Sequence, residues 1–312
     1  MINFRFHLIS LIAVFLALAL GVVMGYAVLG QPTVDTLQDR VNTVEARANE
    51  IRSENDALRS EVSRLESVMN EVDDFAVTSR LSGASVVPVA VRGVDGDKVT
   101  EAALLARRAE ALVPGNVWLE EKWGLANDED AQQLAAIVGT PSTSRVAVRE
   151  AAARALAARL TAGPGPAGKT DLLVALDDAG FIALEDVDGI RFDGAAFDGR
   201  GSRVLVVGGN DAAVNVERSV LPLARALAST GRPVVVADEW RDVEKGPRRG
   251  EELAGIRDDR DLASQVATAD NFDTADGPLT AVLVLGERGQ GTIAHYGFGR
   301  GADRAVPVWW IV

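Results

Sequence analysis

The chain opens with two long apolar patterns that follow each other directly. Residues 8–29, LISLIAVFLALALGVVMGYAVL, contain no charged side chain. An α-helix of about 22 residues rises roughly 1.5 Å per residue and crosses a bilayer core of about 30 Å. The first pattern therefore predicts a transmembrane helix at residues 8–29, preceded by a short tail at residues 1–7.

A cleaved signal peptide is the alternative reading of this segment. Signal peptides combine a basic start with an apolar core of roughly 7–15 residues and a small-residue cleavage site. Here the apolar run is longer and ends at Tyr26-Ala-Val-Leu29, without such a site. We expect a retained anchor.

Charge flanking the span gives little information on its orientation. Arg5 precedes it, and Arg40 and Arg47 follow, whereas a clear bias of Lys and Arg would mark the cytoplasmic side. A seven-residue tail is easier to leave in the cytoplasm than to translocate. We therefore expect a single-pass protein of the cell membrane with its C-terminal domain outside the cytoplasm.

Heptads replace the continuous apolar run across residues 33–73, where apolar positions alternate at spacings of three and four. This spacing is typical of a coiled coil. Gly21 and Gly25 of the preceding span also form a GxxxG pair, which lets two helix backbones approach closely, although two small residues in an Ala-rich span explain it equally. The residues expected at a dimer interface are Gly21, Gly25, Val34, Leu37, Val41, Val44, Ala48, Ile51, Asn55, Leu58, Val62, Leu65, Met69 and Val72.

Asn55 occupies a core position of this seam, where a polar residue sets register and favours dimers at some cost in stability. Flanking charges are mixed and do not decide orientation, but a shared membrane anchor favours parallel pairing. The sequence thus predicts a homodimer on a parallel coiled-coil stalk. The alternative is one amphipathic helix packed on its own domain.

About 235 residues beyond the stalk suffice for one large or two small domains. The net charge of -13 argues against nucleic acid as a partner. The chain contains no Cys, which excludes disulfides, thiolate nucleophiles and thiolate metal sites. No cofactor is expected.

Alternating apolar runs and helical stretches predict an α/β domain at residues 81–312, with a mostly parallel sheet covered by helices. A turn cluster at residues 163–168 is a candidate subdomain boundary. Strands are expected at residues 84–91, 116–120, 181–184, 203–207, 233–237 and 281–285. Helices are expected at residues 98–112, 128–138, 145–160, 170–179 and 215–229.

Two glycine motifs resemble phosphate-binding loops. Residues 163–170, GPGPAGKT, match the pattern GxxxxGK[ST], but Pro164 and Pro166 lack N–H donors and a helix is predicted before them. A loop is the better interpretation. Residues 207–211, VGGND, follow a strand, where open α/β sheets often bind ligands, yet the dinucleotide spacing is incomplete and favours a tight turn.

Other chemical candidates are sparse. Acidic clusters at residues 177–178, 185–188 and 258–261 match no calcium-loop spacing and are interpreted as solvated loop charge. The glycines at residues 286–301 predict a flexible stretch around His295. With only His7 and His295 and no Cys, a His-based triad or zinc site is nearly excluded, and any metal site is unknown.

Several segments together resemble the actinobacterial MctB family: FRFHLISLIAVFLALALGVVMG at the N-terminus, the coiled coil, and the strand at residues 85–91. ADNFDTADG at residues 269–277, leading into an expected strand, and HYG at residues 295–297 add to it. The resemblance implies a copper-transport protein of the mycobacterial envelope, with an outer-membrane, pore-forming role in efflux.

Two functions remain open. One is copper efflux or tolerance, including a role as an indirect envelope component. The other is a non-catalytic dimeric scaffold that binds envelope or cell-division proteins. An enzyme is not expected, because no acid–base constellation can be identified.

Overall fold

The structure is a computed structural model that describes residues 4–29, 31–165, 170–194, 199–242 and 246–307. Contacts between residues divide the chain into two compact units, residues 1–67 and 68–312. Each unit is described by itself.

Two helices make up the first unit, α1 (Phe4–Leu29) and most of α2 (Gln31–Val77). Within the described residues, one helix segment, Phe4–Tyr26, is long and apolar enough to cross a membrane, and none of it is buried. The predicted apolar helix is therefore confirmed. A single helix runs through the heptads, and its pairing with a second copy stays a prediction.

The second unit is built around a seven-stranded sheet of order β3-β2-β1-β4-β5-β6-β7. Its strands are β1 (Ser85–Val91), β2 (Asn116–Leu119), β3 (Ile182–Glu185), β4 (Ser202–Gly209), β5 (Val234–Glu239), β6 (Ala267–Ala269) and β7 (His295–Tyr296). Its helices after α2 are α3 (Gly96–Arg108), the 3-10 turn η1 (Glu121–Gly124), α4 (Asp128–Val138), α5 (Arg145–Ala162), α6 (Leu172–Asp178), α7 (Val220–Ala228), α8 (Ala254–Arg257), α9 (Arg260–Ala263) and α10 (Gly277–Gly289).

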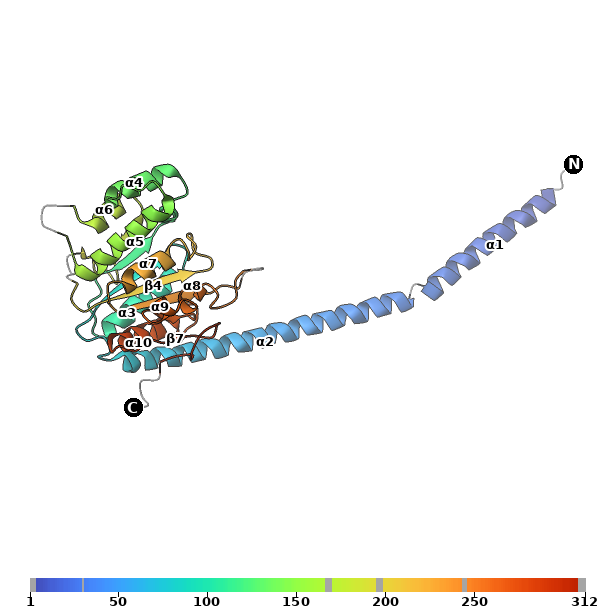
Figure 1. The fold of residues 1–312 in the computed structure, drawn as a ribbon. Helices are drawn as coiled ribbons and strands as arrows, with labels where there is room; N and C mark the ends of the chain where they lie inside the picture. The colour runs from blue at the N-terminus through green and yellow to red at the C-terminus, as the bar shows by residue number, and fades with distance from the viewer. Residues whose placement is uncertain (1–3, 30, 166–169, 195–198, 243–245, 308–312) are drawn as a thin grey trace. The chain divides into compact units, whose positions relative to one another are not determined.

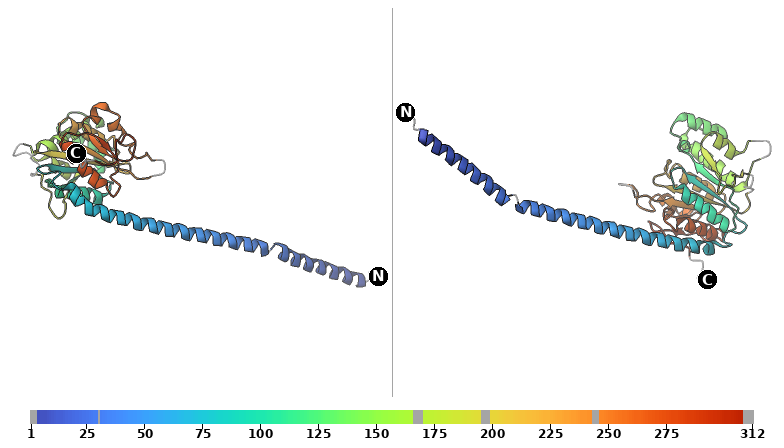
Figure 2. Two further views of the ribbon diagram at one scale, coloured as in Figure 1. Left: turned by 90° about the horizontal axis from the view of Figure 1, so that it is seen from below. Right: turned by 180° about the vertical axis from the view of Figure 1, so that it is seen from behind.

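Helices cover both faces of this sheet, as Figures 1 and 2 show. Side chains alternate across β1, so Val87 and Val89 pack with α4, α5 and α7 on one face. Val86 and Ala90 pack with α3 and α10 on the other, where Val77 at the end of α2 is also buried. All neighbouring strands are parallel except β2 and β3. The predicted α/β class is confirmed.

One predicted strand is wrong. Residues 281–285 lie inside α10, because a short apolar run fits a helix buried on most sides as well as a strand. Pro278 stands in the first turn of this helix, where its missing N–H costs nothing. The segment at residues 269–277 therefore leads into a helix, and Gly286 and Gly289 are helical rather than part of a flexible stretch.

Strands β6 and β7 were not predicted, because runs of three and two residues give no readable alternation. The order of strands reverses at β1, since β2 lies on one side of it and β4 on the other. Such a switch point, at the carboxyl ends of the strands, is where open α/β sheets bind ligands.

Candidate functional site

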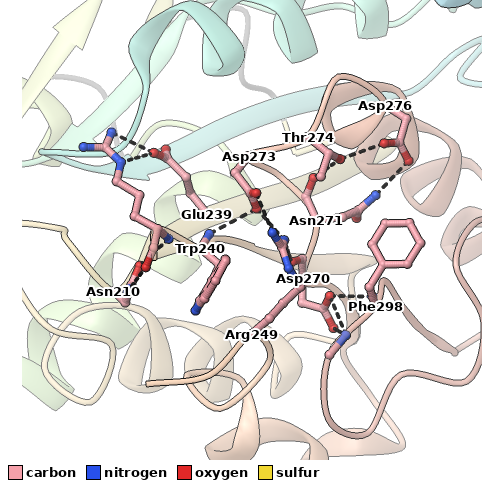
Figure 3. A network of polar contacts seen from close by, with 12 residues as sticks. Asn210, Glu239, Trp240, Arg249, Asp270, Asn271, Asp273, Thr274, Asp276 and Phe298 are labelled. Atoms are coloured by element: carbon pink, nitrogen blue, oxygen red, sulfur yellow. Dashed lines mark hydrogen bonds and ion pairs between the residues drawn. The ribbon is translucent and has the colours of Figure 1, made fainter. Parts of the chain in front are cut away.

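A network of polar side chains lies at the carboxyl ends of β5, β6 and β7. Strands β6 and β7 pair at Thr268 with His295 and at Ala269 with Tyr296. The two segments quoted above for the family resemblance, residues 269–277 and 295–297, are thus adjacent in space although they are separate in the sequence. Figure 3 shows the network that surrounds them.

Asp270, directly after β6, fixes the loop that follows β7. Its Oδ1 accepts the N–H groups of Phe298 at 2.7 Å and Gly299 at 3.0 Å (Figure 3). Gly297 has φ +122°, and a Cβ there would lie 2.1 Å from Asp270 Oδ1. Glycine is required at this position for two reasons. Any side chain would collide with the Asp270 carboxylate, and a positive φ is unfavourable for residues other than glycine.

Arg257 neutralises Asp270 in the interior. Its Nη1 lies 2.8 Å from Asp270 Oδ2, and the two side chains are 3% and 0% exposed. The guanidinium also donates to Thr268 Oγ1 at 2.8 Å and to the Tyr296 carbonyl at 2.9 Å. A buried charge is tolerated only with a partner and satisfied hydrogen bonds, so Arg257 ties β6, β7 and the following loop together.

A second arginine joins the loops after β5 and β6. Arg249 binds both carboxylate oxygens of Asp273, at 2.6 and 2.7 Å, and its Nη1 donates to the Asp270 carbonyl at 2.7 Å. Its guanidinium lies over the ring of Trp240, 4.8 Å from the centroid. The hydrogen bond to Asp273 raises the pKa of Arg249, so this arginine is permanently charged.

Glu239, at the end of β5, fills the switch point between β1 and β4. Its Oε2 accepts the N–H of Asp95 at 2.5 Å, directly before α3, and its Oε1 accepts from Arg241 at 2.7 Å. The backbone carbonyl of Glu239 lies close to Gly209, where an added Cβ would be 2.7 Å from that oxygen. A helix N-terminus favours negative charge, so this chain supplies its own carboxylate where other α/β sheets bind a ligand.

The predicted glycine motif at residues 207–211 belongs to this closed edge. Asn210 exchanges two hydrogen bonds with the backbone of Arg241, at 2.8 and 2.9 Å. Arg241 also lies 3.2 Å from Asp211. The interpretation as an ordinary turn agrees with these contacts.

Asp238 is the anomaly of the network. Its side chain is 1% exposed, and neither carboxylate oxygen has a hydrogen-bond partner. Burial raises the pKa of Asp238 to about 8, and the nearby charges of Glu252, Asp270 and Asp273 act in the same direction. Asp238 is therefore largely protonated at neutral pH.

His295 is the imidazole of this edge. Its Nδ1 lies 3.0 Å from Thr268 Oγ1, and burial together with the charge of Arg257 lowers its pKa. Among the residues that the structure describes, no three His, Cys, Asp or Glu side chains are grouped so as to hold a metal ion. The arrangement can present a neutral imidazole but does not assemble a metal centre around it.

Several acids of the clusters singled out in the sequence accept hydrogen bonds from backbone N–H groups. Asp177 accepts the N–H of Leu184 at 3.2 Å, and Asp186 accepts that of Phe192 at 2.7 Å. Asp259 caps α9 through the N–H groups of Asp261 and Leu262. Of the GxxxxGK[ST] match, residues 166–169 lie outside the described residues, and the segment before it is helix α5 rather than the strand that a phosphate loop needs.

The expected dimer-interface residues lie on α1 and α2. Nothing lies within 4 Å of a Cβ placed on Gly21 or Gly25, and Asn55 donates to the carbonyl of Ile51 at 2.9 Å. The side chains of Val34, Met69 and Val72 lie outside the described part of the chain. Ala48 is half-buried, and the remaining large seam side chains are exposed: Leu37, Val41, Val44, Ile51, Leu58, Val62 and Leu65.

Sequence reasoning missed the two arginines and Asp238. Arg257 and Arg249 lie next to acidic or loop segments of the sequence. An isolated arginine in such a segment is ordinarily predicted to be exposed. The one usable signal was an acid near the end of each of two strands, Asp238 within β5 and Asp270 directly after β6, since charges so placed meet at one sheet edge.

Comparison with known proteins places this architecture in one family. Residues 1–307 match the family described as "Copper transport outer membrane protein, MctB". The copper transporter MctB of Mycobacterium leprae (strain TN) is 34% identical, and the alignment covers 97% of this chain and 98% of that protein. The copper transporter MctB of Mycobacterium tuberculosis (strain H37Rv) is 28% identical over the same shares. The resemblance read from the sequence is confirmed, and the chain belongs to the MctB family.

Proposed function

We propose that this chain acts in copper transport or tolerance as a membrane-anchored component of the cell envelope. The observation that carries the proposal is the family match across residues 1–307, together with relatives named copper transporters that align over 97% of the chain. Helix α1 supplies the anchor. One helix segment among the described residues is long and apolar enough to cross a membrane, which supports a single-pass topology, and we propose that the α/β unit lies outside the cytoplasm. The family description names the outer membrane.

The role is indirect, through another envelope protein that handles the metal. Copper(I) prefers thiolate, thioether and imidazole ligands. The chain has no Cys, its methionines are Met1, Met24 and Met69, and His295 is the one imidazole after residue 7. The Nδ1 of His295 already contacts Thr268, so one imidazole nitrogen is left to bind metal. Copper needs two or more soft ligands.

Copper tolerance of a strain that lacks this protein tests the proposal. We expect the wild-type chain to restore growth at raised copper, and His295→Ala to restore it within about twofold. Met24→Leu, on α1, is the matched control outside the α/β unit. A strain without any copper phenotype would contradict the role in tolerance, and complete loss of rescue by His295→Ala in a folded protein would contradict the indirect mechanism.

A dimeric scaffold is the second candidate function, favoured by the apolar stripe on α2. Leu37, Ile51 and Leu58 are 57%, 56% and 58% exposed in the single chain, and leaving such a stripe in water costs about 25 cal/mol per Å² of apolar surface. A second copy of the same helix covers it with matching heptads. The dimer would display two α/β units to an envelope partner.

No catalytic role is proposed. Ligands of open α/β sheets bind at the switch point, and in this chain Glu239 and Arg241 occupy it with their own ion pair at 2.7 Å. A binding module agrees with this arrangement better than an enzyme.

A further inference from the structure

The opposite edge of the sheet, beside β3, contains a cavity of about 600 Å³. Small-molecule sites usually measure about 300–1,000 Å³. Its walls come from α5, α6, β3 and the loop at residues 186–194. Nothing in the proposed copper function uses this cavity.

Arg159, on α5, lines the cavity from the interior side. Its side chain is 4% exposed. Nε donates to Asp171 Oδ2 at 2.7 Å, and Nη2 donates to the Gly194 carbonyl at 2.7 Å. Its Nη1 is buried and has no hydrogen-bond partner. A buried donor without an acceptor is costly, so this guanidinium has an unmet need for one more oxygen.

Three of the four carboxylate oxygens of Asp171 and Asp186 accept a hydrogen bond, whereas Arg159 Nη1 and the Arg191 side chain have no acceptor among the described residues. Asp171 uses one oxygen for Arg159 and the other to cap α6 through the N–H of Leu173 at 2.8 Å. Asp186 accepts the N–H of Phe192. Arg191 also lines the cavity and is exposed, and among the described residues its side chain makes no hydrogen bond or ion pair. A ligand that complements this wall therefore carries a negative acceptor group.

The rest of the wall is apolar. Leu173 is fully buried, and Val174, Leu184 and Phe192 present further hydrocarbon to the cavity. We propose that this cavity binds a small organic carboxylate with an apolar body, its carboxylate held by Arg159 and Arg191 and its body packed on Val174, Leu184 and Phe192. Arginine suits this task because its planar N–H groups match a carboxylate.

Binding of 4-phenylbutyrate to the full chain in lipid nanodiscs tests the site, with empty nanodiscs subtracted. The uncharged 4-phenylbutanol and inorganic phosphate are the two comparison probes. We expect saturable binding of the acid. The alcohol and phosphate should each bind at least about tenfold more weakly, because one lacks the charge-assisted hydrogen bonds and the other the apolar contact. Equal affinity for either probe would overturn the proposal, as would no saturation by about 10 mM acid.

Variants place the binding in this cavity. Arg191→Ala should weaken it about threefold to tenfold, and Val174→Trp, which fills the space, should abolish it. Arg154→Ala and Val146→Trp are matched controls on α5 outside the cavity lining and should leave it unchanged. Arg159→Gln, where it folds, also tests the buried donor. Arg191→Ala and Val174→Trp test the location of the site without it. Binding that survives Val174→Trp would overturn the assignment.

Discussion

The two units of this chain treat apolar and charged side chains in opposite ways. On α1 and α2, large apolar residues such as Leu11 and Leu58 are more than half exposed. In the α/β unit, Val87 and Phe272 are fully buried, and even an ion pair, Arg257 with Asp270, lies in the interior. The first unit leaves its apolar side chains exposed, whereas the second buries its apolar side chains and pairs most of its buried charges, with Asp238 and Arg159 Nη1 as exceptions.

The difference identifies where each unit obtains its stability. An isolated helix in water is marginal, so we expect α1 to depend on the membrane and α2 on pairing with a second copy. The α/β unit depends on packing and on its buried polar network. All five tryptophans, at residues 118, 123, 240, 309 and 310, follow residue 68. Tryptophan fluorescence of the full chain therefore reports unfolding of the second unit alone.

Removing one member of the buried ion pair should have the largest effect. Arg257→Ala or Asp270→Ala leaves an uncompensated charge in the interior and should lower the free energy of unfolding by about 3–5 kcal/mol. The matched control is Arg300→Ala, whose pair with Asp258 is 64% and 58% exposed and should cost less than about 1 kcal/mol. Similar losses in urea titrations followed by tryptophan fluorescence would refute a special role of burial.

Crowding at Gly297 should have the next largest effect. Gly297→Ala places a methyl group against Asp270 at φ +122° and should cost about 2–4 kcal/mol. Gly291→Ala is the control, since Gly291 also has positive φ, +94°, but open space around it; about 1 kcal/mol is expected there. Equal costs would mean that backbone strain alone, without the Asp270 contact, explains the glycine.

The pH dependence of stability should depend on Asp238. Its pKa is raised from 3.8 to about 8 in the folded chain, so unfolding releases a proton between these values. The stabilising contribution is complete below pH 3.8 and is lost as the pH rises through about 8, with a slope of at most about 1.4 kcal/mol per pH unit. Asp238→Asn should flatten this slope in urea titrations from pH 5 to 9. A parallel curve for the variant would assign the dependence to other groups.

On the helical unit, Asn55→Leu should have the smallest effect and the opposite sign. Replacing a polar seam residue should stabilise helix pairing by about 1 kcal/mol and loosen the choice of oligomer. Sedimentation of a stalk peptide, residues 31–75, measures both, with Ser60→Leu on the outer face as the control. A wild-type peptide that stays monomeric at high micromolar concentration would contradict pairing altogether.

The same contrast explains how far the sequence could be read. Residues 8–29 and the heptads are local, repetitive patterns, and both predicted helices are present. Strands of four or more residues, such as β1 and β4, were also predicted. Residues 281–285 were assigned wrongly because burial on most sides of α10 erases its helical periodicity.

The polar network could be predicted only in part. The segments at residues 269–277 and 295–297 were noticed separately, but their meeting depends on β6 and β7, which are too short to recognise. The Arg257–Asp270 pair is a tertiary contact between residues 13 apart whose burial has no local signature. The expected seam residues were readable from spacing alone, and their pairing remains a prediction.

Cysteine cross-linking in native membranes tests most directly whether α2 is covered by a second copy of itself. The chain has no cysteine, so a single introduced thiol can form a disulfide only between chains, and only where the two Cα atoms approach within about 7 Å. Leu37→Cys and Leu58→Cys lie on the seam, and Ser60→Cys lies on the outer face. A parallel homodimer predicts dimer bands for both seam variants and none for Ser60→Cys. Equal cross-linking at all three positions, or none at either seam position, would contradict it.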